Sequence, residues 1–354
     1  MRSRLLLVLL IAPLACQADP DLNAEPGSTD ATVVLTQAVL TAAAETITPE
    51  DLYARVGVLA DDSMRGRYTP SPELEEVAAW AAAEFQAMGL NPGGDAGGYV
   101  QHYPIPARRG QEATGEMAPN VVAILPGSDP LLRDEYVVFS AHMDHTGVGT
   151  PDANGDSIRN GADDDASGTA TVMEIAEAMA SLPLAPRRSM MFVLVSGEER
   201  GLWGSEYFAN NAPVPAESMV ANLNLDMVGR NWPDTIVAIG KEHSDLGATL
   251  NRVNAAHPEI GMTAIDDIWP DERFYFRSDH YNFAVKGVPV LFFFNGTHED
   301  YHRPSDELDK IDTEKMARIG RLVFYLGVDV GQADARPQWD PESYQSIVEG
   351  GNGG

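Results

Sequence analysis

Cysteine is nearly absent from this chain of 354 residues, which contains a single one, Cys16. One cysteine cannot form a disulfide within the chain, and it cannot supply the several thiolates that a cysteine-based metal cluster needs. A metal bound by the mature protein would therefore be held by histidine and carboxylate side chains.

Basic residues are also scarce. Lys and Arg number 24 against 53 Asp and Glu, which gives a formal net charge of −29. Nucleic-acid-binding surfaces need clusters of Lys and Arg, so this balance argues against a nucleic-acid partner. The negative charge favours solubility and attracts cationic groups. The length and the apolar content of 44% suit one large domain or two modest ones, and exclude a disordered or collagen-like chain.

Long apolar runs are limited to one, at the N-terminus. Leu5–Leu14 follows a basic start and is too short to span a bilayer. We therefore expect residues 1–18 to be an export signal. Cys16 lies where a lipoprotein signal carries its acylated cysteine, which predicts a membrane-anchored lipoprotein facing the periplasm or the cell surface. The alternative is ordinary cleavage after Ala18, which would leave a soluble periplasmic or secreted protein.

The rest of the chain divides into a flexible linker (residues 19–45), a single folded domain (46–332) and a tail (333–354). The linker is rich in Ala, Thr, Asp and Pro and has no sustained periodicity. In the domain, strands alternate with helices, and several strands are continuous apolar runs, as in central strands covered on both faces. We therefore predict an α/β domain with a mixed, largely parallel sheet sandwiched by helices. The expected strands are 120–125, 135–141, 189–196, 221–228, 235–239 and 288–294, and the expected helices are one beginning at Pro49 and those at 72–88, 167–181, 202–210, 243–257, 279–285 and 313–330.

Five segments rich in acidic residues or histidine lie at or just beyond the ends of predicted strands. Open α/β sheets build their functional sites at this position. Few basic residues accompany the segments, with Arg200 and Arg303 as the exceptions. The five segments are SAHMDH at 140–145, GADDDASG at 161–168, SGEERG at 196–201, NLDMVG at 224–229 and EDYHRP at 299–304.

Each segment alone has an ordinary structural explanation. The aspartates at 163–165 could cap a helix, and Glu198 with Glu199 could form a solvated turn. Asp226 is harder to explain in this way, because its apolar neighbours imply burial, and an unpaired buried carboxylate is costly unless a cation binds it. Carboxylates that converge without basic partners favour metal cations. Imidazole and carboxylate ligands suit zinc, and two neighbouring zinc ions need a bridging carboxylate.

Taken in order, the five segments resemble those of the co-catalytic dizinc aminopeptidases, metallopeptidase family twenty-eight. The resemblance runs from about Asp51 to Val330. It implies that each of two zinc ions is held by one imidazole, one terminal carboxylate, a shared aspartate and a shared hydroxide. Carried across by position, the ligands are His142 and Asp226 for the first metal, Glu199 and His302 for the second metal, and Asp164 as the bridging carboxylate.

The same resemblance implies an exopeptidase that hydrolyses N-terminal residues from peptides with a free N-terminus. Glu198 directly precedes a ligand and is the expected general base, which then protonates the departing amine. Tyr301 also precedes a ligand, and its phenol is expected to donate a hydrogen bond to the tetrahedral oxyanion.

Five further residues beside these segments have smaller expected roles or none. Asp144 is expected to orient an imidazole, and Asp279 borders the site as a support residue. Asp163 and Asp165 flank the bridging position and are expected to shape the loop. His145 has no assigned role.

The first side chain of the substrate is expected to bind in an aromatic pocket, which predicts a preference for apolar residues such as Leu or Phe. The acidic balance around the metals favours recognition of a protonated amine. The expected lining residues are Trp269, Phe274, Tyr275 and Phe276.

Three alternatives stay open. Glutaminyl cyclase has the same fold, uses a single zinc and makes no hydrolytic cut, although its segment at the bridging aspartate departs from the ASG form seen here. Carboxypeptidases of the family recognise a carboxylate through arginines, and Arg230 and Arg277 keep that option open. A non-catalytic binding ectodomain would keep the fold and lose the ligands, whereas all five ligand positions are filled in this sequence.

Overall fold

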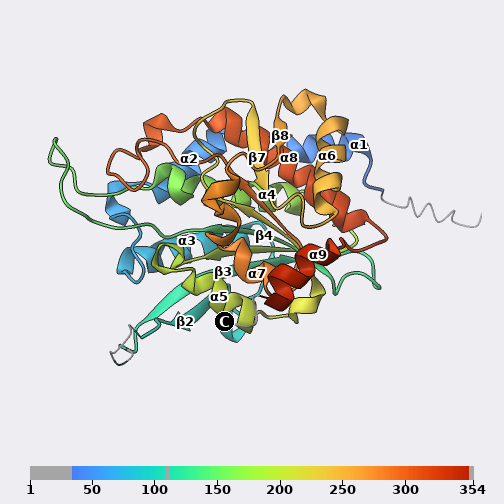
Figure 1. Ribbon diagram of the computed structural model, residues 1–354, viewed down its shortest axis with the longest axis horizontal. Helices are drawn as coiled ribbons and strands as arrows, with labels where there is room; N and C mark the ends of the chain where they lie inside the picture. Colours follow the sequence, from blue (N-terminus) through green and yellow to red (C-terminus); the bar gives the residue numbers. More distant parts are fainter. Residues whose placement is uncertain (1–33, 108–111, 113, 351–354) are drawn as a thin grey trace, which may run out of the picture. The chain divides into compact units, whose positions relative to one another are not determined.

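The structure is a computed structural model that describes residues 34–107, 112 and 114–350 (Figure 1). The chain divides into two units, Met1–Val34 and Leu35–Gly354, and all described residues except Val34 belong to the second. The predicted export signal with Cys16, and the predicted linker up to residue 33, lie outside the described residues. In the described part of the chain, no helix offers an apolar stretch of membrane-spanning length.

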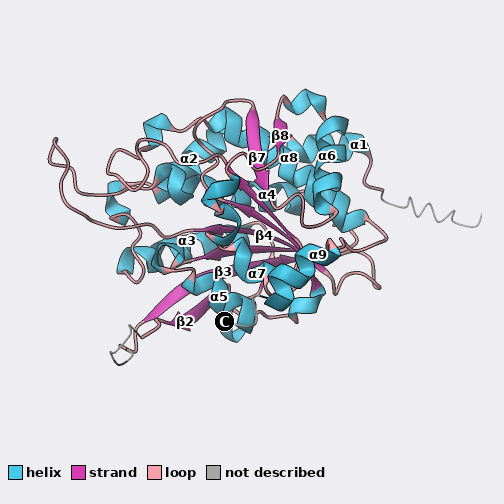
Figure 2. Cartoon of the chain, viewed as in Figure 1, coloured by secondary structure: helices cyan, strands magenta, loops and turns pink. Residues whose placement is uncertain are grey.

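A mixed sheet runs through the domain, with helices packed on both of its faces (Figure 2). Its strands are β1 (Asn91–Pro92), β2 (Val100–Pro104), β3 (Met117–Leu125), β4 (Tyr136–His142), β5 (Ser189–Val195), β6 (Met219–Leu225), β7 (Thr235–Ile239), β8 (Thr263–Ile265) and β9 (Val290–Phe294). Within the described residues the order is β1-β3-β5-β4-β6-β9-β7-β8, and β2 pairs with β3. The pairs formed by β5, β4, β6 and β9 are parallel, whereas β3 and β7 join this centre antiparallel. The predicted mixed, largely parallel sheet is confirmed.

The central strands are apolar along their whole length because both of their faces are covered. All seven residues of β5 and of β6 are buried. Successive side chains of a strand point to opposite faces. In β5, Phe192 and Leu194 therefore join one core layer, and Val193 and Val195 join the other.

Most of the helices cover one face of the sheet. The helices of the larger core layer are α1 (Gln37–Ala44), α2 (Pro49–Leu59), α3 (Pro72–Ala87), α4 (Gly168–Ala180), α6 (Leu246–Ala256) and α8 (Thr313–Gln332). The opposite layer contains α5 (Trp203–Asn211) and α7 (His280–Ala284), and the short α9 (Pro341–Tyr344) precedes Ile347, which packs in the same layer. As expected from the sequence, Thr48 caps α2, and its hydroxyl accepts a hydrogen bond from the amide of Asp51.

Two helices lie in segments where the sequence predicts none. Residues 37–44, within the predicted linker, form α1, which is capped by Thr36 and buries Ala43 and Ala44. Helix α9 lies in the predicted tail and is capped by Asp340. Both are short and bury few large side chains, so neither leaves a strong apolar period in the sequence.

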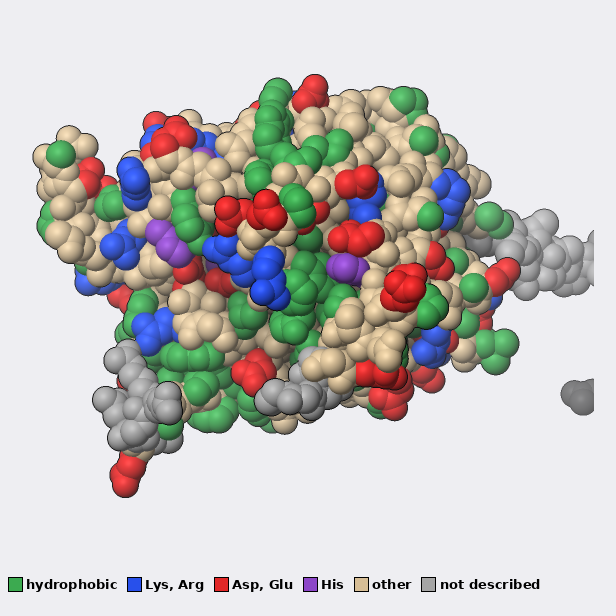
Figure 3. All heavy atoms as spheres, in the orientation of Figure 1, with side chains coloured by type: hydrophobic (Ala, Val, Ile, Leu, Met, Phe, Trp, Pro, Cys, Tyr) green, Lys and Arg blue, Asp and Glu red, His purple; other side chains and the backbone are tan. Residues whose placement is uncertain are grey.

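The excess acidic residues are spread over the surface. On the face shown in Figure 3, Asp and Glu side chains lie in several separate groups, with Lys and Arg side chains near some of them. Some of the Lys and Arg side chains form ion pairs elsewhere in the domain. Arg55, for example, contacts Glu84, Glu174 and Glu177. Basic residues paired in this way are not available to the acidic segments at the strand ends.

Candidate metal centre

The parallel strands bring the predicted site residues to one edge of the sheet. Strands β5, β4 and β6 are neighbours, with His142 paired to Val195 and Ser140 paired to Asn224. His142 is the last residue of β4, Glu198 and Glu199 follow β5 after a two-residue turn, and Asp226 directly follows β6. Because parallel strands end at the same edge, residues more than 80 positions apart in the chain become neighbours.

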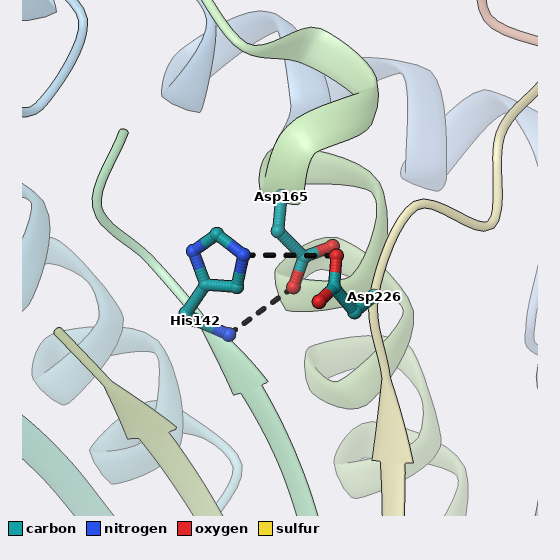
Figure 4. A group of neighbouring side chains, drawn as sticks. All are labelled: His142, Asp165 and Asp226. Atoms are coloured by element: carbon teal, nitrogen blue, oxygen red, sulfur yellow. Dashed lines mark hydrogen bonds and ion pairs between the residues drawn. The ribbon is translucent and has the colours of Figure 1, made fainter. Parts of the chain in front are cut away.

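The first group joins an imidazole to two carboxylates. Nε2 of His142 lies 3.3 Å from Oδ1 of Asp164 and 3.6 Å from Oδ1 of Asp226. Figure 4 shows the ring of His142, at the end of β4, facing the Asp226 carboxylate. Burial alone would lower the pKa of His142, but the carboxylates of Asp226 and its neighbours raise this pKa well above its ordinary value. The pocket is thus rich in negative charge and suited to a cation.

The second group uses the other oxygen of the same aspartate. Nε2 of His302 lies 3.1 Å from Oδ2 of Asp164 and 3.1 Å from Oε1 of Glu199. Asp164 therefore presents Oδ1 to one imidazole group and Oδ2 to the other, which is the arrangement of a bridging carboxylate. All five residues predicted as ligands are brought together in this way.

His145 lies at the second group as well, although the sequence assigned it no role. Its Nδ1 is 2.9 Å from Oε1 of Glu199 and 3.6 Å from Oδ2 of Asp164. His145, Asp164 and Glu199 form a compact set of potential ligands, as do His142, Asp165 and Asp226.

The loop that carries Asp164 is held by its acidic neighbours. The carboxylate of Asp165 accepts hydrogen bonds from the backbone amides of His142, Gly168 and Met227 at 2.8–3.2 Å. Figure 4 shows the contact from Asp165 to the backbone nitrogen of His142. These bonds occupy both of its oxygens, so its contacts fit the predicted loop-shaping role. The Asp163 carboxylate likewise accepts a hydrogen bond from a backbone amide, that of Gly229 at 2.6 Å, so its contact also fits a loop-shaping role.

Asp306, which the sequence analysis did not single out, supports the same loop. Its carboxylate accepts hydrogen bonds from the backbone amides of Asp163 and Asp164 at 3.1–3.2 Å. Burial raises the pKa of Asp306 to about 6. The backbone at Asp164, the predicted bridging residue, is therefore held by a carboxylate from a segment some 140 residues downstream.

Asp144, which is expected to orient an imidazole, lies against that of His142. Nδ1 of His142 is 3.1 Å from the backbone carbonyl oxygen of Asp144 and 3.6 Å from its carboxylate. The carboxylate also accepts hydrogen bonds from the hydroxyl of Thr69, at 2.8 Å, and from the backbone amide of Glu198, at 3.3 Å. The backbone of Asp144 thus orients His142, and its side chain positions the segment of the predicted base.

Glu198 and Tyr301 border the space beside the first group. Both line a small pocket of about 50 Å³ together with His142, Asp164 and Asp226. Burial raises the pKa of Glu198 well above its ordinary value. Burial, together with the nearby carboxylates, also raises the pKa of the Tyr301 phenol, so this group stays protonated and can donate a hydrogen bond.

The segment before α7 supports Asp226. The hydroxyl of Ser278, which the sequence analysis did not assign, donates a hydrogen bond of 2.9 Å to Oδ2 of Asp226. This leaves Oδ1 directed at His142. The next residue, Asp279, is fully buried, and burial raises its pKa to about 7.

Arg67 lies beneath the site and was also not anticipated. Its fully buried guanidinium donates hydrogen bonds of 2.6–3.0 Å to the backbone carbonyls of Leu59, Met143, Asn160 and Gly161. Burial lowers its pKa to about 10. Arg67 therefore ties the turn after β4 to the start of the loop that carries Asp164.

The pocket beside the first group differs from the predicted one. Of the four predicted aromatic residues, only Phe274 lines it. Trp269 packs against Phe274 and Phe294, Tyr275 is buried in the core, and Phe276 is exposed at the surface. The remaining apolar walls come from Met227, Phe292 and Phe294, and Arg277, Ser278 and Thr297 complete the lining.

The donor atoms of the second group suit a metal. Oδ2 of Asp164, Oε1 of Glu199 and Nε2 of His302 are buried, and they have no hydrogen-bond partner among the described residues. Buried polar atoms are almost always paired, so atoms that converge unpaired fit a shared cation. Zinc accepts nitrogen and oxygen donors of these types. Fold and site together define the class of metal-dependent hydrolases with an α/β sheet.

Comparison with known families places the chain within this class. The model for Peptidase family M28 matches residues 120–327. The match covers more than half of the chain, and the chain therefore belongs to peptidase family M28. This confirms the resemblance seen in the sequence and the expectation of a peptidase.

Curated relatives are about one quarter identical to this chain over the aligned residues. A probable zinc metalloprotease from Leptosphaeria maculans is 27% identical over 298 residues, which cover 73% of this chain and 68% of the relative. Aminopeptidase YwaD from Bacillus subtilis is 27% identical over 236 residues, which cover 64% of this chain and 47% of the relative. The chain thus spans about half the length of several relatives that it matches.

Solved structures share the fold. A zinc aminopeptidase from Bacillus subtilis superimposes with a TM-score of 0.65 at 15% identity, covering 82% of this chain and 97% of that one. The LapA aminopeptidase from Legionella pneumophila gives a TM-score of 0.62 at 22% identity, covering 83% and 75%. A glutaminyl cyclase from Porphyromonas gingivalis gives a TM-score of 0.62 at 18% identity, covering 79% and 97%.

Proposed function

We propose that this protein is a zinc-dependent exopeptidase that removes N-terminal residues from peptides and uses two zinc ions. The observation that carries the proposal is the position of Asp164, whose two oxygens serve two separate imidazole and carboxylate groups. His142 and Asp226 would hold one metal, and His302 and Glu199 the other. Relatives named as zinc metalloprotease and aminopeptidase support the choice of metal and reaction.

The chain supplies the proton transfers and the charge stabilisation. Bound zinc ions would polarise the peptide carbonyl and make water a stronger nucleophile. Glu198 accepts the proton of the attacking water on its carboxylate and returns it to the departing amine nitrogen. The Tyr301 phenol donates a hydrogen bond to the developing oxyanion. Asp144 keeps Glu198 in place through the backbone amide of that residue.

The charges around the pocket support recognition of a free amino terminus. Glu198, Asp164 and Asp226 all line it, and a protonated amine can be held by such carboxylates. Of the two arginines that keep the carboxypeptidase alternative open, Arg230 is paired with Asp300 at 3.0 Å. Arg277 is the only basic residue among the described residues that line the pocket, so a substrate carboxylate could pair with only one cation there.

Removal and return of metal test the proposal. Chelation should abolish cleavage of aminoacyl anilides, and added zinc should restore it. N-acetylation of a good peptide substrate should lower kcat/KM at least about tenfold, because a charged, hydrogen-bonded anchor is lost. Equal cleavage of free and acetylated peptides would exclude the aminopeptidase while leaving a dizinc hydrolase. Cyclisation of N-terminal glutamine without any hydrolysis would favour the cyclase alternative, whose fold is also shared.

A further inference from the structure

His145 is a fully buried histidine at the proposed metal centre, and the function described above gives it no role. It lies three residues beyond His142, in the turn that follows β4. Neither of its ring nitrogens has a hydrogen-bond partner among the described residues. A buried imidazole without a partner is uncommon and needs an explanation.

The position of Nδ1 matches that of a metal ligand. It lies 2.9 Å from Oε1 of Glu199 and 3.6 Å from Oδ2 of Asp164, and Nε2 of His302 lies 3.1 Å from each of the same two oxygens. Ligand atoms about 2.0–2.1 Å from one zinc ion are about 2.9–3.6 Å apart at the angles of four- and five-coordinate sites. The separations of both imidazoles from the two oxygens therefore fall within the range expected for a shared metal.

The contact with Glu199 is short, since Nδ1 of His145 lies 2.9 Å from Oε1. Nε2 of His302 lies 3.1 Å from the same oxygen. Two imidazoles therefore converge on one carboxylate oxygen, as the ligands of one shared cation would.

The fold holds the His145 ring in this position. A Cβ atom on Gly161 would lie 2.5 Å from Cγ of His145, so the ring occupies space that only glycine leaves. The backbone amide of His145 donates to the carbonyl of Arg67 at 3.2 Å. The ring also packs edge-on against His302, with 5.5 Å between ring centroids.

We propose that His145 is a sixth protein ligand of the centre and binds the second metal through Nδ1. The second metal would then have two imidazoles, from His145 and His302, whereas the first has only His142. An extra protein ligand makes the two positions unequal, with the second metal bound more tightly. This inference rests on the proposed dizinc function, because it assigns a residue to the second of its metals.

Metal affinity measured on the full chain tests the assignment without relying on activity. Zinc is titrated into metal-free protein against a chromophoric chelator to obtain a Kd for each position, and cobalt is added separately to record the visible spectrum. In His145→Phe, which fills the space but offers no nitrogen, one Kd should rise at least about tenfold and the cobalt spectrum should change, while the other Kd stays the same. His102→Phe, at a side chain that is 41% exposed, is the matched control and should leave both constants unchanged.

A second variant separates a ligand from a hydrogen-bond donor. His145→Gln keeps an N–H that can reach Glu199 but removes the imidazole, so it should bind the second metal as weakly as His145→Phe. Wild-type affinity in His145→Gln, or wild-type affinity and an unchanged cobalt spectrum in His145→Phe, would overturn the proposal. Thermal unfolding of the metal-free variants, expected within a few degrees of wild type, shows that the fold is retained.

The wild-type titration separates the two proposals. Two zinc ions in wild type with an unchanged His145→Phe would refute only the role of His145. Fewer than two zinc ions in wild type would refute the dizinc function, and the sixth ligand with it.

Discussion

Replacement of Arg67 by Met should destabilise the protein strongly even in the absence of metal. Among the described residues, the substitution removes every hydrogen-bond donor to the backbone carbonyls of Leu59, Met143 and Asn160, and one of the two donors to that of Gly161. A buried acceptor left without a partner costs about 1–3 kcal/mol. Part of this is recovered because the variant no longer buries a charge. We therefore expect a net loss of about 3–5 kcal/mol, the range found when one partner of a buried charged contact is removed.

Thermal unfolding of metal-free protein measures this loss. An unfolding entropy of about 2.1 cal/mol/K per residue, over the roughly 320 residues of the folded unit, gives about 0.7 kcal/mol/K, so Tm should fall by about 4–7 °C. Arg65→Met is the matched control, because this nearby side chain is 59% exposed and lies 3.4 Å from Glu73. The control should stay within about 0.5 kcal/mol of wild type. If Arg67→Met lowered Tm no more than the control does, the claim that Arg67 stabilises the backbone beneath the site would be refuted.

Three further predictions concern the chemistry, the pocket and export. Glu198→Ala should retain two zinc ions while kcat falls about 10²–10⁴-fold, and loss of a metal would show that Glu198 is a ligand. Leu- and Phe-anilides should be cleaved at least about tenfold faster than the Asp-anilide, because Phe274, Phe292 and Phe294 line the pocket; comparable rates would contradict an apolar pocket. Full-length protein expressed in an exporting bacterial host should incorporate a fatty-acid analogue, and the Cys16→Ala variant should not; an unlabelled wild type would indicate ordinary signal cleavage.

The sheet could be predicted because its strands are long apolar runs. The segments 189–196 and 235–239, for example, coincide almost residue for residue with β5 and β7. The convergence of His142, Glu199 and Asp226 follows from the same prediction, since parallel neighbours end at one edge. Short elements such as β1 and β8 have too few residues to show a period.

The supporting contacts could not be predicted, because they depend on residues distant in the sequence. Arg67 lies 76 residues from Met143 and 94 from Gly161, and no local pattern distinguishes it from an exposed arginine. The pocket walls Phe292 and Phe294 lie in a continuous apolar strand, where the sequence alone does not tell which face meets the site. His145 follows a strand end, and the direction of its side chain is decided by the turn and by Gly161.

Metal content is the most direct test of the central claim. Protein is purified, dialysed against buffer with a low, controlled zinc concentration, and analysed for elements per chain. We expect two zinc ions per chain in wild type, and fewer than two in Asp164→Asn, because Asp164 presents one oxygen to each imidazole group. One zinc ion in wild type would point to the cyclase-like alternative, and a chain that binds none yet remains fully active would contradict the account.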